Sequence, residues 1–180
     1  NVNDVGDFYQ GGVIYYIFNS QDNGYIPGEI HGLIAAVENQ GSQNTWTINL
    51  TNNPDGNYVT TGATGFAIGT GRANTDAIIA VQGTASSHAA GLARAYAGGS
   101  YTDWFLPSKY ELNKMYLNKA TINSTATANG GSNFSDDGYW SSTEHSYVYA
   151  WYYDFDWNVS GIARKETTYE ANKVRAVRAF

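Results

Sequence analysis

The side chains that could carry out chemistry are few and poorly grouped in this sequence. The three histidines, His31, His88 and His145, have no partner at the spacing of metal ligands, and no HExxH motif is present. No GxSxG motif supports a serine nucleophile, although a Ser-His-Asp triad assembled by the fold stays open. The absence of cysteine excludes a disulfide framework, a thiolate zinc site and cysteine catalysis. We therefore expect that the chain is not an enzyme and that it binds neither a metal ion nor a cofactor.

Two further motifs favour structural roles. Residues 62–71 are rich in glycine, but they lack the Gly-Lys-Ser/Thr ending of a P-loop and the strand-turn-helix setting of a dinucleotide fold. We expect a tightly turning loop. Asp136 and Asp137 could contribute to a calcium site, but calcium takes about six to eight oxygen ligands, so a turn with solvated acids is favoured. No spacing in the sequence supports a pair of glycosidase carboxylates.

Residues 139–157 carry the strongest functional signal. Nine of these nineteen residues are Phe, Tyr or Trp, and a sheet core can absorb one face of such a run but not both. Strand alternation puts Trp151, Tyr153 and Phe155 on one face, which is the natural core face. The other face carries Tyr152, Asp154, Asp156 and Asn158. We expect this face to meet solvent, together with three residues just upstream: His145, Tyr147 and Tyr149.

Exposed Tyr and Trp interleaved with Asp and Asn are typical of binding surfaces. The alternative is a β-meander with a tyrosine-rich edge. On composition alone, the segment favours binding.

The strands that must position this segment are marked by apolar runs. Residues 13–18 are a continuous β-branched and aromatic run, which predicts a buried strand, and residues 32–37 predict a second. Residues 38–71 are expected to be irregular, with one short strand around Trp46 and a turn at residues 54–56. A further short strand is predicted at residues 104–106, and Trp140, Val174, Val177 and Phe180 look like core positions of later strands.

Helical signals lie between these strands. Asn74 is expected to be an N-cap, and the apolar pattern continues to Tyr96, with Gly83 a point at which it could divide into two helices. Ser108 and Glu111 form a capping box that opens a helix to about residue 118. Residues 121–138 predict a surface loop. The order of strands, helices and strands indicates a single α+β domain.

Composition limits the partners. Only 14% of the residues are charged, against about 25% in typical soluble domains. The net charge of −6 argues against nucleic acid and anionic membranes, which need clustered Lys and Arg. The basic residues near the C-terminus are expected to pair with acids or to cap the last strand. No apolar stretch is long enough for membrane insertion. The expected partner is an unknown protein or glycan on a target surface, and the oligomeric state stays open.

Several motifs follow one another in the order of a bacterial family. They are Gly6-Asp7-x-x-x-Gly11-Gly12, His31-Gly32-Leu33-Ile34-Ala35, Leu106-Pro107-Ser108-x-x-Glu111-Leu112, Tyr139-Trp140-Ser141-Ser142-Thr143-Glu144, Ala150-Trp151-x-x-x-Phe155 and Val174-Arg175-Ala176-Val177-Arg178. Over nearly its whole length the chain resembles the C-terminal domain family of Legionella collagen-like proteins, and it is similar to the Fibrobacter major paralogous domain.

The resemblance implies a C-type lectin-like fold over residues 1–180, with antiparallel sheets, two or three helices and long loops. That group includes the formylglycine-generating enzymes, but this chain has no cysteine, so their oxidase chemistry is not expected. It also lacks a Glu-Pro-Asn or Gln-Pro-Asp motif. Val159 follows Trp157-Asn158 where a calcium-dependent lectin needs Asp, so calcium-mediated sugar binding is not expected either.

Several members of this family are variable proteins of diversity-generating retroelements, in which a segment near the C-terminus is rewritten by adenine-directed mutagenesis. The resemblance implies such a segment at about residues 140–173, on a framework of Trp140, Trp151, Phe155, Lys165 and residues 174–180. Most of the intervening residue types are readily reached from an Asn codon; Trp157 is not. The ligand-binding positions would be His145, Ser146, Tyr147, Tyr149, Tyr152, Tyr153, Asp154, Asp156, Trp157, Asn158 and Ser160.

Three hypotheses follow. The first, which we favour, is a ligand-binding display domain, an adhesin or receptor-binding protein, at the cell surface, on a virion or otherwise outside the cell. The second is a carbohydrate-active enzyme or lectin with an acidic cleft around Asp136, Asp137, Asp154 and Asp156. The third is a structural module of a surface assembly.

Overall fold

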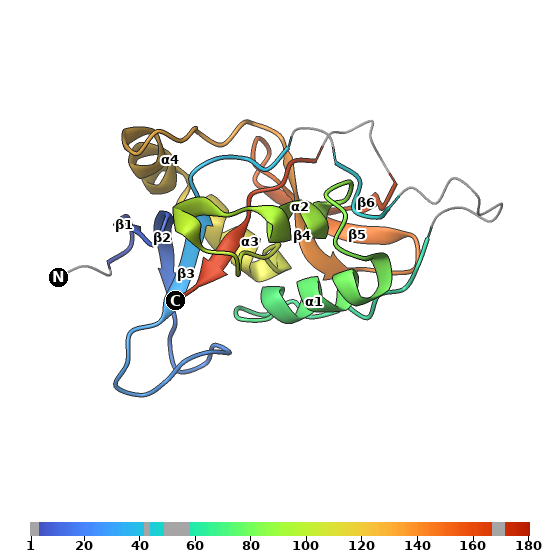
Figure 1. Cartoon of the computed structure of the whole chain (residues 1–180), viewed down its shortest axis with the longest axis horizontal. Helices are drawn as coiled ribbons and strands as arrows, with labels where there is room; N and C mark the ends of the chain where they lie inside the picture. Colours follow the sequence, from blue (N-terminus) through green and yellow to red (C-terminus); the bar gives the residue numbers. More distant parts are fainter. Residues whose placement is uncertain (1–3, 42–43, 49–57, 167–171) are drawn as a thin grey trace.

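The computed structural model describes residues 4–41, 44–48, 58–166 and 172–180. Within these residues the chain forms four α-helices and two antiparallel sheets, which confirms the α+β class (Figure 1). The strands are β1 (Phe8–Tyr9), β2 (Gly12–Ile17), β3 (Gly32–Ala36), β4 (Gly138–Glu144), β5 (Tyr149–Asp154), β6 (Val159–Arg164) and β7 (Val177–Ala179). The helices are α1 (Gly71–Gln82), α2 (Ala89–Ala95), α3 (Lys109–Leu117) and α4 (Lys119–Ala128), with a short 3-10 turn at Gly98–Ser100.

The first sheet has the order β1-β2-β3-β7 and so joins the two ends of the chain. In β3, Leu33 lies opposite Ala179 of β7, and Ala35 lies opposite Val13 of β2. Both strands predicted at the N-terminal end are confirmed. Gly12 is required at its position because a Cβ there would lie 2.3 Å from the carbonyl oxygen of Ala35.

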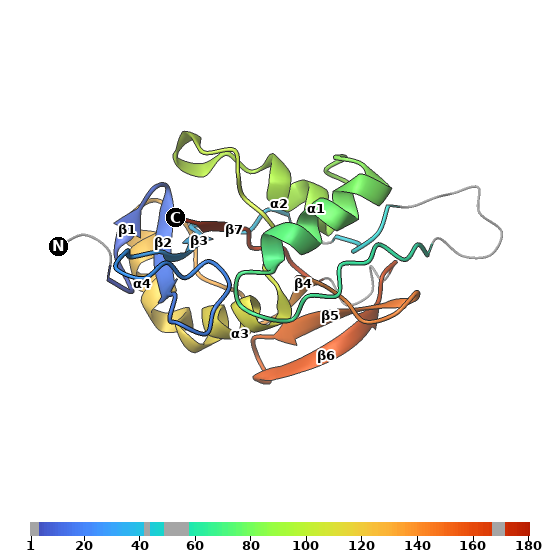
Figure 2. The ribbon, with the colours of Figure 1, turned by 90° about the horizontal axis from the view of Figure 1, so that it is seen from below.

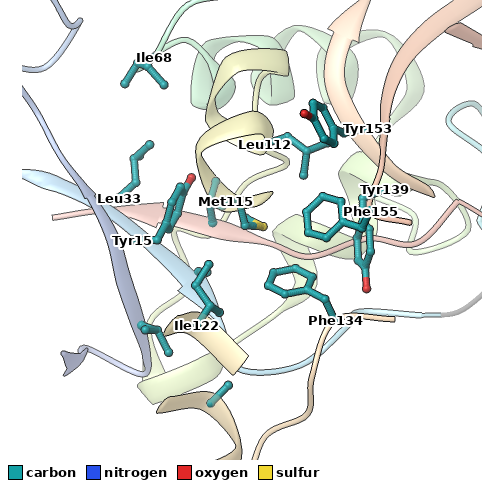
Figure 3. Packing of buried hydrophobic residues seen from close by; sticks show 14 of the residues in the cluster. Tyr15, Leu33, Ile68, Leu112, Met115, Ile122, Phe134, Tyr139, Tyr153 and Phe155 are labelled. Carbon is teal, nitrogen blue, oxygen red and sulfur yellow. The ribbon is translucent and has the colours of Figure 1, made fainter. Parts of the chain in front are cut away.

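Both faces of this sheet are buried, which explains why its central strands are apolar without interruption. Val13, Tyr15 and Leu33 belong to one core cluster, and Ile14 and Ile34 belong to the other. The first cluster also contains residues of α3 and α4 and the rings of Phe134, Tyr139 and Phe155, which lie together in Figure 3. The second contains residues of α1 and α2 with Trp46, Trp104 and Trp140.

The second sheet has the order β4-β5-β6, and β6 forms its outer edge (Figure 2). β4 is almost completely buried, whereas β6 is largely exposed. The predicted framework residues Trp140 and Phe155 are buried, at 0% and 2% exposure. Among the other predicted core positions, Val174 and Val177 are fully buried and Phe180 is partly buried.

Within the described residues, the short strands expected around Trp46 and at residues 104–106 exist only as isolated bridges. Thr45 bridges to His88, and Phe105 bridges to Val177 of β7. Trp46 itself is fully buried. The turn expected at residues 54–56 lies outside the described residues.

The prediction that Asn74 caps the first helix is wrong. α1 begins at Gly71, and Asn74 is buried inside it. Its side-chain amide holds the preceding loop, accepting from the Gly65 nitrogen at 3.0 Å and donating to the Gly65 oxygen at 2.7 Å. The break at Gly83 is confirmed, since Gly83 ends α1 with φ 78°. α2 then begins after His88, whose buried ring accepts a hydrogen bond from the Gly91 nitrogen.

The loop expected at residues 121–138 is also wrong in its first part, because α4 continues to Ala128. Thr, Asn and Ser are weak helix formers, so the helical spacing of two buried residues among them was not recognised in the sequence. Ile122 and Ala126 lie four positions apart on one face and pack into the first core cluster. Tertiary packing therefore stabilises this helix against its propensity.

The capping box of α3 is confirmed, and its acid also holds the glycine-rich loop. The Ser108 hydroxyl accepts from the Glu111 nitrogen, and the Glu111 carboxylate accepts from the Ser108 nitrogen at 2.7 Å. The same carboxylate accepts from the nitrogens of Gly69 and Gly71, at 2.8 and 3.3 Å. Residues 62–71 are thus a structural loop tied to the start of α3.

Glu111 is fully buried, and loss of water raises its pKa from 4.5 to about 7, although the backbone N–H groups oppose the rise. Between these two pH values the folded chain keeps a proton that the unfolded chain releases. The contribution of Glu111 to the free energy of unfolding is therefore fully present below pH 4.5. It is lost as the pH rises through 7, and the total loss is about 3 kcal/mol.

We expect Glu111→Gln to remove this contribution while keeping the capping box, which accepts Gln. The measurement is the free energy of unfolding in urea for both proteins between pH 4.5 and 7.5. The variant should lose less stability than the parent over that range. Identical pH profiles would contradict the assignment.

The basic residues near the C-terminus pair with acids, as expected. Arg164, Lys165, Lys173 and Arg178 form ion pairs with Glu166, Glu144, Asp137 and Asp103, respectively. Arg175 instead donates to a side-chain amide and two backbone carbonyl groups.

Candidate functional site

The hairpin of β5 and β6 places the predicted site residues on two opposite faces. Trp151 pairs with Ile162, and Tyr153 pairs with Ser160, so these four side chains share one face. This face looks toward the start of α3. The other face contains Ala150, Tyr152 and Ala163, and it packs against the second core cluster.

Tyr152 is therefore not on an open face, as the strand alternation had suggested. It is half-buried, and its ring lies edge-on to Trp140 with 6.4 Å between the ring centroids. A Cβ on Gly161 of β6 would come within 2.7 Å of the same ring. Alternation is confirmed within β5, but Tyr149 shares the face of Trp151 instead of the expected face of Tyr152, and residues 155–158 form a turn. The face of β5 that we expected to meet solvent is largely covered.

A group of exposed and partly exposed rings lies on the α3 side of the hairpin. We name this group, Phe66, Tyr110, His145, Tyr149 and Trp151, the aromatic surface. The ring centroid of Phe66 lies 6.2 Å from that of Tyr110 and 6.0 Å from that of Trp151. His145 lies 5.3 Å from Trp151 and 6.5 Å from Tyr149. Tyr110 is 51% exposed.

One backbone hydrogen bond and two hydrogen bonds of the Thr143 hydroxyl hold the parts of this surface together. The Tyr110 nitrogen donates to the Phe66 oxygen at 3.1 Å, and the Thr143 hydroxyl donates to the Gly65 oxygen at 2.8 Å. The same hydroxyl accepts from the Lys109 nitrogen at 2.9 Å. The loop around Phe66, the first turn of α3 and the end of β4 are thereby fixed to one another.

Lys109 provides a cation in the middle of the aromatic surface. Its Nζ lies 3.4 Å from the ring centroid of Trp151 and 5.5 Å from that of Phe66. Loss of water lowers the pKa of Lys109. No carboxylate pairs with it among the described residues. Within the same part of the chain, the buried Nε1 of Trp151 also has no hydrogen-bond acceptor.

A pocket of about 350 Å³ opens beside Lys109, between α3 and the start of β6; we name it the amide pocket. Its lining consists of Lys109, Tyr110, Asn113, Tyr153, Asn158, Val159 and Ser160. The Asn113 amide donates to the Tyr153 hydroxyl at 2.9 Å, and that hydroxyl donates to Asn158 Oδ1 at 2.8 Å. This chain of hydrogen bonds fixes the orientation of both amides.

The turn between β5 and β6 presents the most exposed ring of the predicted set. Asp154 accepts hydrogen bonds from the nitrogens of Asp156 and Trp157, both at 2.9 Å, and Asn158 adopts φ 54°. Trp157 is 77% exposed. Asp154 thus shapes the turn, whereas Asp156, Trp157 and Asn158 are open to solvent.

The other end of the hairpin carries a separate group. Ser146 accepts from the nitrogens of Val148 and Tyr149 and so shapes the turn there. Tyr147 is 47% exposed, with its ring centroid 5.7 Å from that of Tyr58. Burial and a hydrogen bond to Glu166 raise the pKa of Tyr58 to about 12.

Three of the four carboxylates proposed for an acidic cleft are engaged in local contacts. Asp136 pairs with Lys119 at 2.6 Å and Asp137 with Lys173 at 3.2 Å, while Asp154 caps its own turn. Neither the amide pocket nor a pocket of about 390 Å³ beside Tyr116 and Lys119 is lined by a carboxylate. Within the described residues, no cluster of three or more His, Asp or Glu side chains is placed to hold a metal ion.

Four contributors to the site were missed in the sequence: Phe66, Lys109, Tyr110 and Asn113. The last three lie on the helix that the capping box predicted, and their spacing places Asn113 one turn beyond Lys109 and Tyr110. That spacing identifies side chains on one side of the helix, but it does not show which other segment of the chain lies beside them. Phe66 had no local signal, because its place depends on contacts with residues more than forty positions away.

None of the helices in the described part of the chain is long and apolar enough to cross a membrane. No model of a known protein family matches the sequence, and a search of curated proteins finds no match either.

Proposed function

We propose that the chain is an extracellular or surface-displayed ligand-binding domain with a C-type lectin-like fold. It binds a protein or glycan on a target surface through the aromatic surface, the amide pocket and Trp157. The motif resemblance supports the fold, and the α+β architecture agrees with it. No catalytic step is proposed.

The observation that carries this proposal is the exposure of large rings on a well-held framework. Tyr110, Tyr147 and Trp157 are 51%, 47% and 77% exposed. Such rings contribute much of the affinity in protein interfaces when a partner covers them. The framework beneath them is buried and hydrogen-bonded, so binding would not require the site to order first.

The same contrast supports the proposal that the segment varies between related copies of the protein. The framework residues Trp140, Phe155 and Lys165 are buried, and Trp151 is partly buried. Every predicted ligand-binding position except Tyr153 is at least partly exposed. A reverse-transcriptase gene beside a near-copy of the coding sequence for this segment would support variation. Several independent genomes lacking both would count against it.

Binding is tested first by screening the purified chain on glycan and protein arrays. On the strongest array ligand, we expect Tyr110→Ser with Trp157→Ser to weaken binding at least ~10-fold, because loss of such rings commonly removes more than about 1.4 kcal/mol. The melting temperature should change by less than ~3 °C, because neither ring is in the core.

The matched control is Tyr25→Ser with Leu117→Ser. These residues are also exposed, at 37% and 62%, but they belong to neither the aromatic surface nor the amide pocket. The control should bind as the parent does. Equal loss in both double variants, or no loss in the first, would contradict the proposed surface.

A further inference from the structure

Lys109 is a cation with no carboxylate partner in the described part of the chain. Its ammonium group lies over Trp151 and Phe66, which displace water, and no acceptor or carboxylate within the described residues replaces that water. An aromatic face compensates a desolvated ammonium only in part. Because a charge-assisted hydrogen bond is stronger than a neutral one, an incoming carboxylate would find a favourable partner here.

The amide pocket beside Lys109 has the size of one sugar ring. Its volume of about 350 Å³ corresponds to roughly a dozen water molecules, and a hexose has a similar number of non-hydrogen atoms. Tyr110, at the rim, is half-exposed and offers an aromatic ring to the less polar face of such a ligand.

The fixed amides supply both kinds of hydrogen-bonding group. Asn113 uses its Nδ2 on Tyr153, and Asn158 uses its Oδ1 on the same hydroxyl. Within the described residues this leaves Asn113 Oδ1 as an acceptor and Asn158 Nδ2 as a donor. A sugar hydroxyl both donates and accepts, so it can satisfy either group.

We propose that the amide pocket binds an acidic sugar, with the ring between Tyr110 and the two amides and the carboxylate on Lys109 Nζ. This inference rests on the proposed binding function and names its ligand class. A Glu side chain of a peptide would satisfy Lys109, but it has no hydroxyls for the Asn113 and Asn158 amides. The pocket lining therefore favours the sugar over the peptide.

The test is a titration of the intact chain, followed by backbone amide NMR signals, with methyl β-glucuronide as the probe. Methyl β-glucoside is the neutral counterpart, and a Glu-containing tripeptide is the peptide counterpart. We expect glucuronide to shift the signals of Lys109 and residues 158–160, and to bind about 10-fold or more tightly than glucoside. That ratio is what a charge-assisted hydrogen bond contributes.

Lys109→Met should reduce glucuronide affinity to the level of glucoside and leave glucoside binding unchanged. Lys109→Arg keeps the charge and should retain part of the preference. Lys114→Met is the matched control, because Lys114 lies on the same helix over Tyr16, with 5.4 Å to the ring centroid, and does not line the pocket. It should bind as the parent does.

Equal binding of glucuronide and glucoside, no binding of either, or equal loss in the Lys109 and Lys114 variants would overturn the inference. Tighter binding of the tripeptide than of glucuronide would overturn its sugar component. Such failures would leave the proposed function standing if an array ligand still depends on Tyr110 and Trp157. Loss of that dependence as well would remove both.

Discussion

Replacing Lys165 by Met is expected to lower the free energy of unfolding by about 3–5 kcal/mol, because it leaves a buried carboxylate without its counter-charge. Lys165 Nζ lies 2.5 Å from Glu144 Oε1, and the two side chains are 0% and 3% exposed. The ammonium also donates to the Val59 oxygen at 2.9 Å and lies 4.9 Å from the ring centroid of Trp46.

The consequence reaches beyond the pair because Glu144 also holds a loop. Its carboxylate accepts from the nitrogens of Thr61 and Gly62, at 2.9 to 3.1 Å. The pair therefore joins the end of β6, the end of β4 and the loop before Phe66. We expect its loss to loosen the aromatic surface as well as to lower global stability.

The measurement is unfolding in urea at pH 7, with Arg164→Gln as the matched control. Arg164 is the neighbouring residue in β6, and its ion pair with Glu166 spans 3.2 Å with both side chains about half exposed. Exposed pairs contribute less than about 1 kcal/mol. Similar losses for the two variants would show that burial does not determine the effect.

The second large effect is expected at Arg175, whose guanidinium joins three segments of the core. Its side chain donates to Asn39 Oδ1 at 2.9 Å, to the Ala36 oxygen at 3.0 Å and to the Ser132 oxygen at 3.2 Å. It also lies 4.2 Å from the ring centroid of Phe134 and is 1% exposed. Burial lowers its pKa to about 10, so it stays charged at neutral pH.

Arg175→Met leaves the buried Ala36 oxygen and two less buried oxygens without their donor. An unsatisfied buried acceptor costs about 1–3 kcal/mol, and the Arg175 side chain also loses its packing on Phe134. We expect a loss of at least ~3 kcal/mol in urea unfolding. Arg175→Lys should lose less, because an ammonium keeps the charge but cannot reproduce the planar fork of the guanidinium.

Arg72→Gln provides the control for Arg175. Arg72 pairs with Asp103 at 3.2 Å, and the two side chains are 42% and 37% exposed. Its loss should stay below about 1 kcal/mol. An equally small loss of unfolding free energy for Arg175→Met would mean that the three oxygens find other donors. The role assigned to Arg175 would then be wrong.

Local patterns predicted the elements whose signal does not depend on partners. The apolar runs of β2 and β3, the break at Gly83 and the capping box of Ser108 and Glu111 are all confirmed. Asn74 shows the limit of this approach. Its residue type suits a helix cap, but the folded chain uses its amide to hold Gly65 instead.

The helix α4 shows a second limit. Its Thr, Asn and Ser residues predicted a loop, because propensity measures the isolated segment. The burial of Ile122 and Ala126 against the first core cluster decides otherwise. Such a contact exists only once the sheet and α3 have formed the surface on which α4 packs.

The sequence by itself indicated antiparallel strands within residues 139–157, and it determined that Trp151 and Tyr153 share a face opposite Tyr152, because strand alternation has a period of two. Only the tertiary structure decided which face is open. The second core cluster covers Tyr152, while α3 covers the opposite face at Tyr153 and leaves Trp151 partly exposed beside Lys109. Alternation records relative orientation within a strand, but exposure depends on what distant segments pack against it.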